Sequence, residues 1–330
     1  MVDPRISLNI VAIGGGTGLA TLLSGLKLFV GNRTGISPGI ADLSAIVAVS
    51  DDGGSSGRLR DELQIPPPGD IRNCMVALSE DSHLLSRLFR HRFAGDGDLG
   101  GHSFGNLFLA ALSEVTGDFA EAVKLSSEIL ASKGHIYPAT DSDVRIAAEL
   151  NDGSIALGET RIGKVGTNIR RLYLDPENCL PMPDALMAIK NADVVTVGPG
   201  SLYTSLLPPL LVKGLADVIE NSGAVKVFVC NLMTQPGETD GLTARRHLEI
   251  VREYAPNLNF DCLVVNSQQI SARQRDLYVM EGAEQIGVHG SMADENIEGA
   301  RVVRAELLAT GDKVRHDPER LARSVLNCAQ

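Results

Sequence analysis

Short apolar segments that end in glycine or polar residues recur along the chain. The segment Leu8–Ile13 leads into Gly14–Gly18, and the leucines between Leu19 and Leu26 then recur at helical spacing. Four more segments follow the same plan, at 43–49, 192–197, 225–230 and 262–265. Apolar strands that alternate with helical periodicity predict an α/β fold with a doubly wound, mostly parallel, Rossmann-like sheet.

Two stretches depart from this alternation. Between about residues 70 and 133 the apolar positions keep helical spacing, which predicts a helical layer. From 135 to 178 the spacing shifts toward two, and Asn151-Asp152-Gly153 is a strong hairpin signal. We therefore predict a small antiparallel β insertion at about 135–178, within a single nucleotide-binding domain that spans 1–330.

Composition and charge exclude several classes of protein. The 330 residues are 44% apolar, which is enough for a core that needs no disulfides. A net charge of -11 without any basic block argues against nucleic acid as a partner. The five cysteines never form a C-x-x-C pair, which indicates reduced thiols. Since we find neither a secretory signal nor a membrane-length apolar segment, we expect a cytoplasmic protein without membrane insertion.

The first glycine-rich turn is a candidate phosphate site. Gly15, Gly16, Thr17 and Gly18 follow an apolar strand and open a helix, whose N-terminus offers unpaired N–H groups and a partial positive charge. It is not the dinucleotide fingerprint, because Leu19 stands where the third glycine belongs, and this argues against a nicotinamide-dependent oxidoreductase. A glycine turn without any ligand remains the alternative.

The second strand runs into a loop that is dense in charge and hydroxyls. Asp51 and Asp52 are candidate Mg²⁺ ligands and candidate catalytic residues, because Mg²⁺ prefers one or two carboxylates together with a substrate phosphate. Ser55 and Ser56 add hydroxyls, and Arg58 can form a fork on a phosphate. The alternative is that an aspartate caps a helix and the arginine lies on a solvated face.

Two further helix entrances carry polar candidates. Asp70 follows a run of three prolines, so it either caps a helix or contacts a ligand. Arg72 and Asn73 lie in the first turn, where a cation suggests a nearby anion. His102 and Asn106 mark another helix entrance, and a structural hydrogen bond is as good an explanation for the histidine as a ligand contact.

The second half of the chain repeats the logic of strand, turn and helix. Gly200, Ser201 and Thr204 follow an apolar strand and combine a glycine turn with hydroxyl donors, so two anion sites would suit a diphosphate. Asn231 and Thr234 follow the next strand and either contact a base or sugar or close a turn.

These motifs together resemble the gluconeogenesis factor family of the YvcK type, which is related to the 2-phospho-L-lactate transferases (CofD). The resemblance extends along nearly the whole chain. It implies a Rossmann-like fold, binding of a nucleotide sugar of the UDP-N-acetylglucosamine type, and a regulatory role in cell shape and peptidoglycan synthesis during gluconeogenic growth. The motifs that carry it are Gly14–Gly18, Ser50–Arg60, Pro67–Arg72, His102–Asn106, Gly198–Thr204 and Asn231–Thr239.

The resemblance also implies roles near the C-terminus. There an arginine and an upstream tyrosine contact the sugar nucleotide in the family, and Arg315 and Tyr278 are the matching residues. A surface ion pair and an interfacial ring are the alternatives. Some relatives carry a threonine after the Arg-His-Asp triplet, where this chain has Pro318, which puts regulatory phosphorylation there in doubt.

Two functions remain open at the level of sequence. One is a sugar-nucleotide-binding regulator without turnover, favoured because no recognisable nucleophile or general base appears. The other is a CofD-like transferase that moves a phospholactate-type group from a nucleotide-activated donor with Mg²⁺ at Asp51 or Asp52. The expected partners are a nucleotide sugar or another nucleotide diphosphate, cell-wall synthesis proteins, and a second copy of the chain in a dimer.

Overall fold

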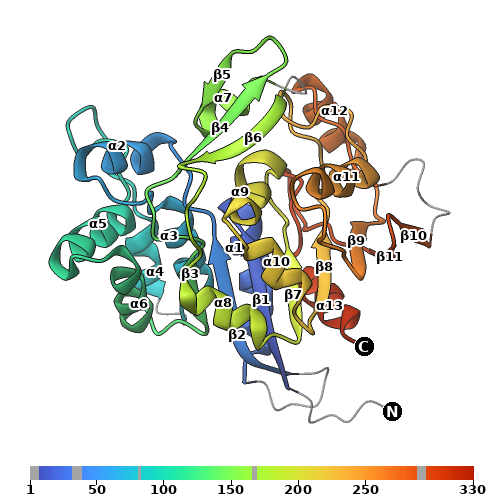
Figure 1. The fold of residues 1–330 in the computed structure, drawn as a ribbon, viewed down its shortest axis with the longest axis horizontal. Coiled ribbons are helices and arrows are strands. Elements are labelled where there is room, and N and C mark those ends of the chain that lie inside the picture. Colours follow the sequence, from blue (N-terminus) through green and yellow to red (C-terminus); the bar gives the residue numbers. More distant parts are fainter. Residues whose placement is uncertain (1–6, 32–38, 81–82, 166–168, 288–294) are drawn as a thin grey trace.

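Two sheets of different size organise the protein in the computed structural model, which describes residues 7–31, 39–80, 83–165, 169–287 and 295–330 (Figure 1). The large sheet has the strand order β10-β11-β9-β8-β7-β1-β2-β3, and all its neighbouring strands are parallel except β10 and β11. Its strands are β1 (Ser7–Gly14), β2 (Gly39–Val47), β3 (His135–Pro138), β7 (Val194–Val197), β8 (Val225–Val229), β9 (Cys262–Asn266), β10 (Asn296–Ile297) and β11 (Ala300–Ala305). The predicted fold class is confirmed.

Helices cover both faces of the large sheet, as a doubly wound fold requires (Figure 1). On one face α1 (Gly16–Leu26) packs against α3 (Gly69–Leu78) and α13 (Pro318–Cys328). The opposite face carries α8 (Pro183–Lys190), α9 (Leu207–Leu211) and α10 (Leu215–Glu220). The remaining longer helices are α2 (Gly54–Leu63), α4 (His83–Arg90), α5 (Phe104–Thr116), α6 (Phe119–Ile129), α11 (Ala244–Tyr254) and α12 (Ala272–Met280). None of the helices in the described ranges has the length and apolar character that crossing a bilayer requires.

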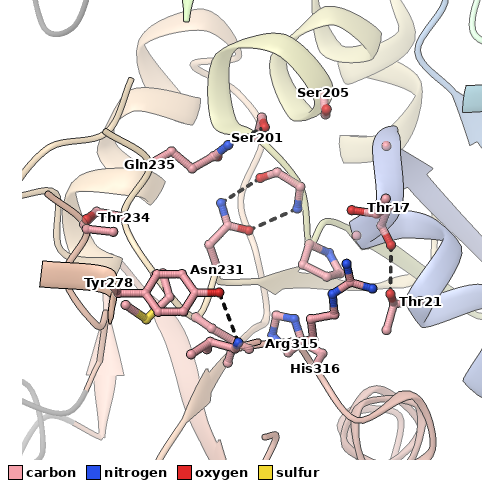
Figure 2. A pocket seen from close by; sticks show the side chains of 18 of the residues that line it. Thr17, Thr21, Ser201, Ser205, Asn231, Thr234, Gln235, Tyr278, Arg315 and His316 are labelled. Atoms are coloured by element: carbon pink, nitrogen blue, oxygen red, sulfur yellow. Dashed lines mark hydrogen bonds between the residues drawn. The ribbon is translucent and has the colours of Figure 1, made fainter. Parts of the chain in front are cut away.

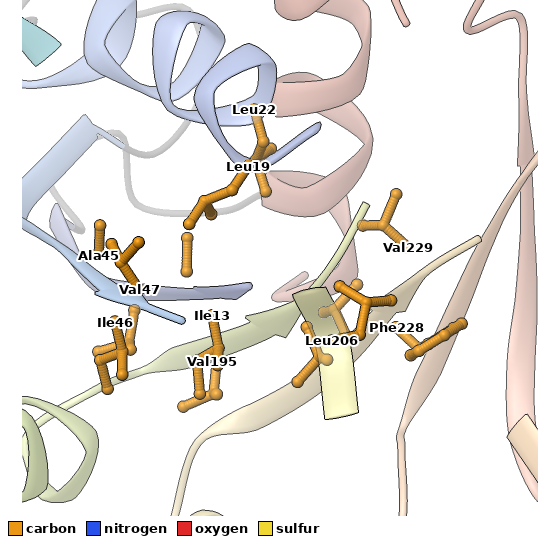
Figure 3. Close-up of a cluster of buried hydrophobic side chains, with 14 of the residues drawn as sticks. Ile13, Leu19, Leu22, Ala45, Ile46, Val47, Val195, Leu206, Phe228 and Val229 are labelled. Atoms are coloured by element: carbon orange, nitrogen blue, oxygen red, sulfur yellow. The ribbon is translucent and has the colours of Figure 1, made fainter. Parts of the chain in front are cut away.

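The core lies on both sides of β1, which explains why its sequence is a continuous apolar run. Leu19 and Leu22 of α1 cover one face of the sheet, and Leu206 lies on the other (Figure 3). Ile13 of β1 and Val195 of β7 are fully buried between these layers. A strand buried on both faces lacks the polar alternation of a half-exposed strand, so its position in the middle of the sheet could be predicted.

The small sheet is antiparallel and has the order β5-β4-β6, with β4 (Arg145–Leu150), β5 (Ile155–Leu157) and β6 (Ile169–Asp175). The predicted hairpin is present, because Gly153 adopts a φ of 82° and donates its N–H to the carbonyl of Leu150. The expected insertion begins at about 135, whereas in the structure 135–138 forms β3 of the large sheet and the antiparallel strands begin at Arg145. The single-domain organisation stays a prediction.

The order of strands reverses at β1. The chain passes from β1 to β2 on one side, and β7 returns to the other side of β1. In open α/β sheets such a switch point leaves a crevice at the carboxyl ends of the strands. The turns after β1 and β7 meet there so closely that a Cβ on Gly18 would lie 2.3 Å from the carbonyl oxygen of Pro199.

Candidate functional site

A cavity of about 360 Å³ opens at this switch point (Figure 2). It is lined by the turns that follow β1, β7 and β8, by Tyr278 of α12, and by the loop before α13. The strand-end turns and the C-terminal residues therefore converge although they lie far apart in the sequence. The predicted residues that line the cavity are Gly15, Gly16, Thr17, Gly18, Gly200, Ser201, Asn231, Thr234, Tyr278 and Arg315.

The beginning of α1 supplies donors to the cavity. The helix starts at Gly16, which has a φ of 64°, and its first internal bond runs from the N–H of Leu19 to the carbonyl of Gly15. Within the described parts of the chain, the N–H groups of Thr17 and Gly18 have no hydrogen-bond partner. Two unpaired N–H groups at a helix N-terminus form a site for a phosphate oxygen.

The turn after β7 differs, because its backbone is already bonded. Asn231 accepts a hydrogen bond from the N–H of Gly200 at 3.1 Å and donates its own amide to the carbonyl of Gly200 at 2.7 Å (Figure 2). Glu238 accepts the N–H of Tyr203 at 3.0 Å. This turn therefore offers mainly hydroxyls, those of Ser201 and Ser205, to a ligand, and Asn231 positions the turn.

The C-terminal wall brings a cation to the cavity. The hydroxyl of Tyr278 accepts the N–H of Val314 at 3.1 Å, which anchors the loop that carries Arg315. Figure 2 shows Arg315 reaching toward Thr17 and Thr21. No carboxylate in the described ranges lies within ion-pair distance of the Arg315 guanidinium. A cation thus faces the helix N-terminus, and both favour an anion between them.

His316 lines the same cavity and is absent from the sequence-based site, although it lies in the Arg-His-Asp triplet. Its ring is buried and bonded to the backbone of Cys230. Burial lowers the pKa of His316 to about 4, so the ring is neutral near pH 7. The positive charge of this wall therefore comes from Arg315.

A group of carboxyls lies beside the cavity. Asp70 accepts the N–H of Gly16, and a Cβ on Gly15 would lie 2.6 Å from its Oδ2. Burial, and next the charge of Asp51, raise the pKa of Asp70 to about 6. Burial, and next the charges of Asp51 and Asp70, raise the pKa of Glu159 to about 8, although a 3.1 Å hydrogen bond from Thr204 opposes the shift. Glu159 lies in α7 (Glu159–Ile162), and no sequence motif pointed to it.

Asp51 and Asp52 have different partners in spite of their adjacency. Asp51 accepts the N–H of Gly53 at 2.8 Å. Asp52 accepts the N–H of Thr160 at 3.2 Å and so joins the loop after β2 to α7, the short helix that follows β5. In the portion of the chain that the structure describes, no three His, Cys, Asp or Glu side chains are arranged to hold a metal ion. Mg²⁺ needs only one or two carboxylates together with a substrate phosphate, so the Mg²⁺ site at Asp51 and Asp52 stays a prediction.

A buried hydrogen-bond network explains three other predicted residues. Ser55 bonds Nδ1 of His102 at 2.9 Å and accepts the side-chain amide of Asn106 at 3.1 Å. All three side chains are buried, so the network fastens α2 to the start of α5. The predicted residues that do not line the cavity are Asp51, Asp52, Ser55, Ser56, Arg58, Asp70, Arg72, Asn73, His102, Asn106 and Thr204.

Comparisons with known proteins agree with this architecture. The family model described as 2-phospho-L-lactate transferase CofD matches residues 10–308. The chain is 43% identical over 322 residues to a gluconeogenesis factor from Halalkalibacterium halodurans, covering 96% of this chain and 95% of the relative. It is 43% identical over 315 residues to the gluconeogenesis factor of Bacillus subtilis, covering 95% and 96%.

A solved structure supports the fold. The crystal structure of a protein from Bacillus halodurans superposes with a TM-score of 0.88 at 42% sequence identity, covering 97% of this chain and 99% of that one. The family model and these relatives span most of the chain, including the turns after β1, β2, β7 and β8. The chain therefore belongs to the CofD-like family, among relatives named gluconeogenesis factors.

Proposed function

We propose that this protein is a cytoplasmic regulator that binds a nucleotide sugar of the UDP-N-acetylglucosamine type in the cavity at the switch point. One observation carries the proposal: the N–H groups of Thr17 and Gly18 and the guanidinium of Arg315, none of which has a partner among the described residues, line one cavity of about 360 Å³. A diphosphate between them receives backbone donors from one side and a charge-assisted hydrogen bond from the other.

The rest of the cavity suits the neutral parts of such a ligand. Hydroxyls of Ser201 and Ser205 and the ring of Tyr278 line its walls. Sugars and bases are bound by such hydroxyls and by aromatic faces. The cavity thus combines the donors of Thr17, Gly18 and Arg315 with a mostly uncharged wall. This combination favours a nucleotide sugar over a free inorganic anion.

Calorimetric titration with UDP-N-acetylglucosamine and with UDP, each with and without Mg²⁺, tests the proposal. We expect saturable binding of the intact ligand. Arg315→Gln should weaken it by ~1.5–3 kcal/mol, because a hydrogen bond to a charged group is lost. The matched control is Arg170→Gln, which removes an arginine whose side chain is 67% exposed and lies outside the cavity.

Two results would contradict the proposal. One is that the folded protein shows neither binding heat nor a higher melting temperature with the ligand. A ligand that binds the native state must raise that temperature. The other is equal affinity in Arg315→Gln and wild type, which would remove the C-terminal wall from the site.

The cellular part of the proposal takes gluconeogenesis from the relatives' name, gluconeogenesis factor, and cell shape and peptidoglycan synthesis from the family resemblance of the sequence motifs. We propose that ligand binding regulates cell shape and peptidoglycan synthesis on gluconeogenic carbon sources through contacts with cell-wall synthesis proteins, and that the protein acts as a dimer. In a strain that lacks the gene, the wild-type chain should restore growth and shape, and Arg315→Gln should not. Light scattering of the purified protein tests the dimer.

A CofD-like transferase is the second candidate function, and the carboxyls of Asp70 and Glu159 favour it. Side chains with pKa values of about 6 and about 8 beside a ligand cavity are suited to general acid–base chemistry. Incubation with a nucleotide-activated phospholactate and a hydroxyl acceptor would reveal a transferred product. Glu159→Gln should abolish the product without lowering donor affinity, whereas an unaltered yield would remove Glu159 from any reaction.

A further inference from the structure

Arginines gather at a second place, at the loop between α4 and α5 and outside the cavity lining. Arg58 of α2 donates to the carbonyl of Gly100 at 2.6 Å, and Arg92 donates to the carbonyl of Gly101. The loop between α4 and α5 therefore holds two guanidiniums side by side. Side chains fixed by backbone carbonyls lose less conformational entropy when they bind a ligand than free surface arginines do.

Arg72 of α3 is the third arginine of this group. Its aliphatic stem packs so tightly on α5 that a Cβ on Gly105 would lie 2.8 Å from its Cγ. One of its terminal nitrogens donates to Asn73 at 2.8 Å, and its Nε is buried without a hydrogen-bond partner in the described chain. A buried guanidinium nitrogen without an acceptor is costly, and an anion would satisfy it.

The charges around this group are mainly positive. Burial lowers the pKa of Arg72, and Arg92 and Arg90 lower it further, against the opposing charges of Asp70 and Asp51. Burial also lowers the pKa of His102, next to Arg58 and Arg92, and Glu62 opposes these charges. The geometry agrees, because a Cβ on Gly101 would lie 3.3 Å from a terminal nitrogen of Arg58, and the carbonyl of the same residue accepts from Arg92.

Several other arginines of this protein have a carboxylate partner. Arg145 pairs with Asp61 at 2.5 Å, Arg170 with Glu149 at 2.9 Å, and Arg252 with Glu298 at 2.9 Å. By contrast, no carboxylate of the described ranges lies within ion-pair distance of Arg58, Arg72 or Arg92. Like charges held together without a counterion destabilise the folded state, and a bound anion would offset this repulsion.

We propose that Arg58, Arg72 and Arg92 form a second anion-binding site, which takes a phosphate or carboxylate group of a second small molecule. The site is distinct from the cavity, because none of its three arginines lines it. Asp70 is linked to both sites, since it accepts the N–H of Gly16 and its charge acts on Arg72.

Chemical footprinting tests this site independently of the proposed function. Phenylglyoxal modifies accessible guanidiniums, and peptide mass spectrometry then measures the rate at each arginine of the full-length protein. Inorganic phosphate and citrate serve as the two probes, one for a phosphoryl and one for a carboxylate ligand. Arg58 and Arg92, both exposed, report on the second site, Arg315 reports on the cavity, and Arg170 is the reference.

We expect at least one anion to protect Arg58 and Arg92 together, with a common half-saturating concentration, and to leave Arg170 unprotected. Arg92→Gln should raise the concentration that half-protects Arg58 about tenfold, because one charge-assisted contact is lost. Arg92→Lys, which keeps the charge but loses the fork, should fall between the two. Protection by phosphate alone or by citrate alone identifies the ligand group.

Two outcomes would overturn the site. In one, neither anion protects Arg58 and Arg92 more than Arg170, and the arginines are a solvated face. In the other, Arg315→Gln abolishes the protection of Arg58 and Arg92→Gln does not, and the anion is then bound in the cavity. The footprint of the wild-type protein decides the first outcome even if a variant folds poorly.

Discussion

The hydroxyl of Tyr278 accepts a hydrogen bond from the N–H of Val314 across 3.1 Å, which fastens α12 to the loop that carries Arg315. Tyr278 therefore has a structural role, as an anchor of this loop, in addition to lining the cavity. Its ring lines the cavity while its hydroxyl holds the neighbouring cation in position.

Tyr278→Phe separates these two functions. The ring is kept and the hydrogen bond is lost, so we expect UDP-N-acetylglucosamine to bind about fivefold more weakly, which corresponds to ~1 kcal/mol. Calorimetric titration measures the change, and Tyr173→Phe, outside the cavity, is the matched control. Equal affinity of Tyr278→Phe and wild type would mean that the loop needs no such anchor.

Gly18→Ala tests the contact between the turns after β1 and β7. The added Cβ would lie 2.3 Å from the carbonyl oxygen of Pro199, so the turns must separate. We expect a loss of ~1–3 kcal/mol in the free energy of unfolding, typical of overpacking, together with weaker nucleotide-sugar binding. Urea denaturation and titration measure the two effects.

Gly223→Ala is the control for that experiment, because a Cβ at Gly223 would meet no atom within 4 Å. It should leave both the stability and the affinity close to wild type. If Gly18→Ala behaves like this control, the two turns are not in rigid contact.

The sequence predicts the centre of this fold better than its margins, and the reason is burial. β1 and β7 are covered on both faces, so their apolar runs are continuous and visible. β3 and β11 were not predicted, because their segments mix apolar residues with His135, Arg301 and Arg304. Strands near the edge of a sheet have a solvated side, which makes their pattern weaker.

Some residues of the candidate site could be predicted from local sequence, and others could not. The turn at Gly15 and Gly16 could be predicted because strand, glycine and helix follow one another locally. Glu159 could not be predicted, because it is far in the sequence from Asp51 and Asp70. It lies near them only because α7 contacts the loop at Asp52. The sequence predicts that Arg58 forms a fork on a phosphate, whereas in the structure Arg58 donates to the carbonyl of Gly100 and does not line the cavity.

Asn231→Asp tests whether the side chain of Asn231 positions the turn after β7. The amide donates to the carbonyl of Gly200 at 2.7 Å, so a carboxylate there would face an oxygen instead. We expect a loss of ~1–3 kcal/mol in the free energy of unfolding at neutral pH. Acidification should restore part of it, because a protonated carboxyl can donate to the carbonyl and the introduced group has a raised pKa in the native state.

The control for this pH dependence is Asn231→Ala, which loses both bonds to Gly200 and introduces no titrating group. Its loss of stability should be the same at every pH. Melting temperatures across an acidic to neutral series compare the two variants, and parallel curves would argue against the repulsion.

Glu159→Gln tests the carboxyls beside the cavity through the pH dependence of stability. The native pKa of Glu159, about 8, lies above its ordinary value of 4.5 because of burial and then of Asp51 and Asp70. Between these values the native state keeps a proton that the unfolded state releases, so the free energy of unfolding falls as pH rises. Asp70 contributes the same trend only up to about 6. Of these two carboxyls, only Glu159 therefore contributes a decline between about pH 6 and pH 8.

In that interval Glu159→Gln should flatten the decline, because the amide stays neutral and can still accept the hydrogen bond from Thr204. Urea denaturation at both ends of the interval measures the slope. Glu177→Gln, a change at a carboxyl that is 54% exposed, should keep the slope of the wild type. If Glu159→Gln keeps it as well, Glu159 is ionised throughout this range and the carboxyls of Asp51, Asp70 and Glu159 share no proton there.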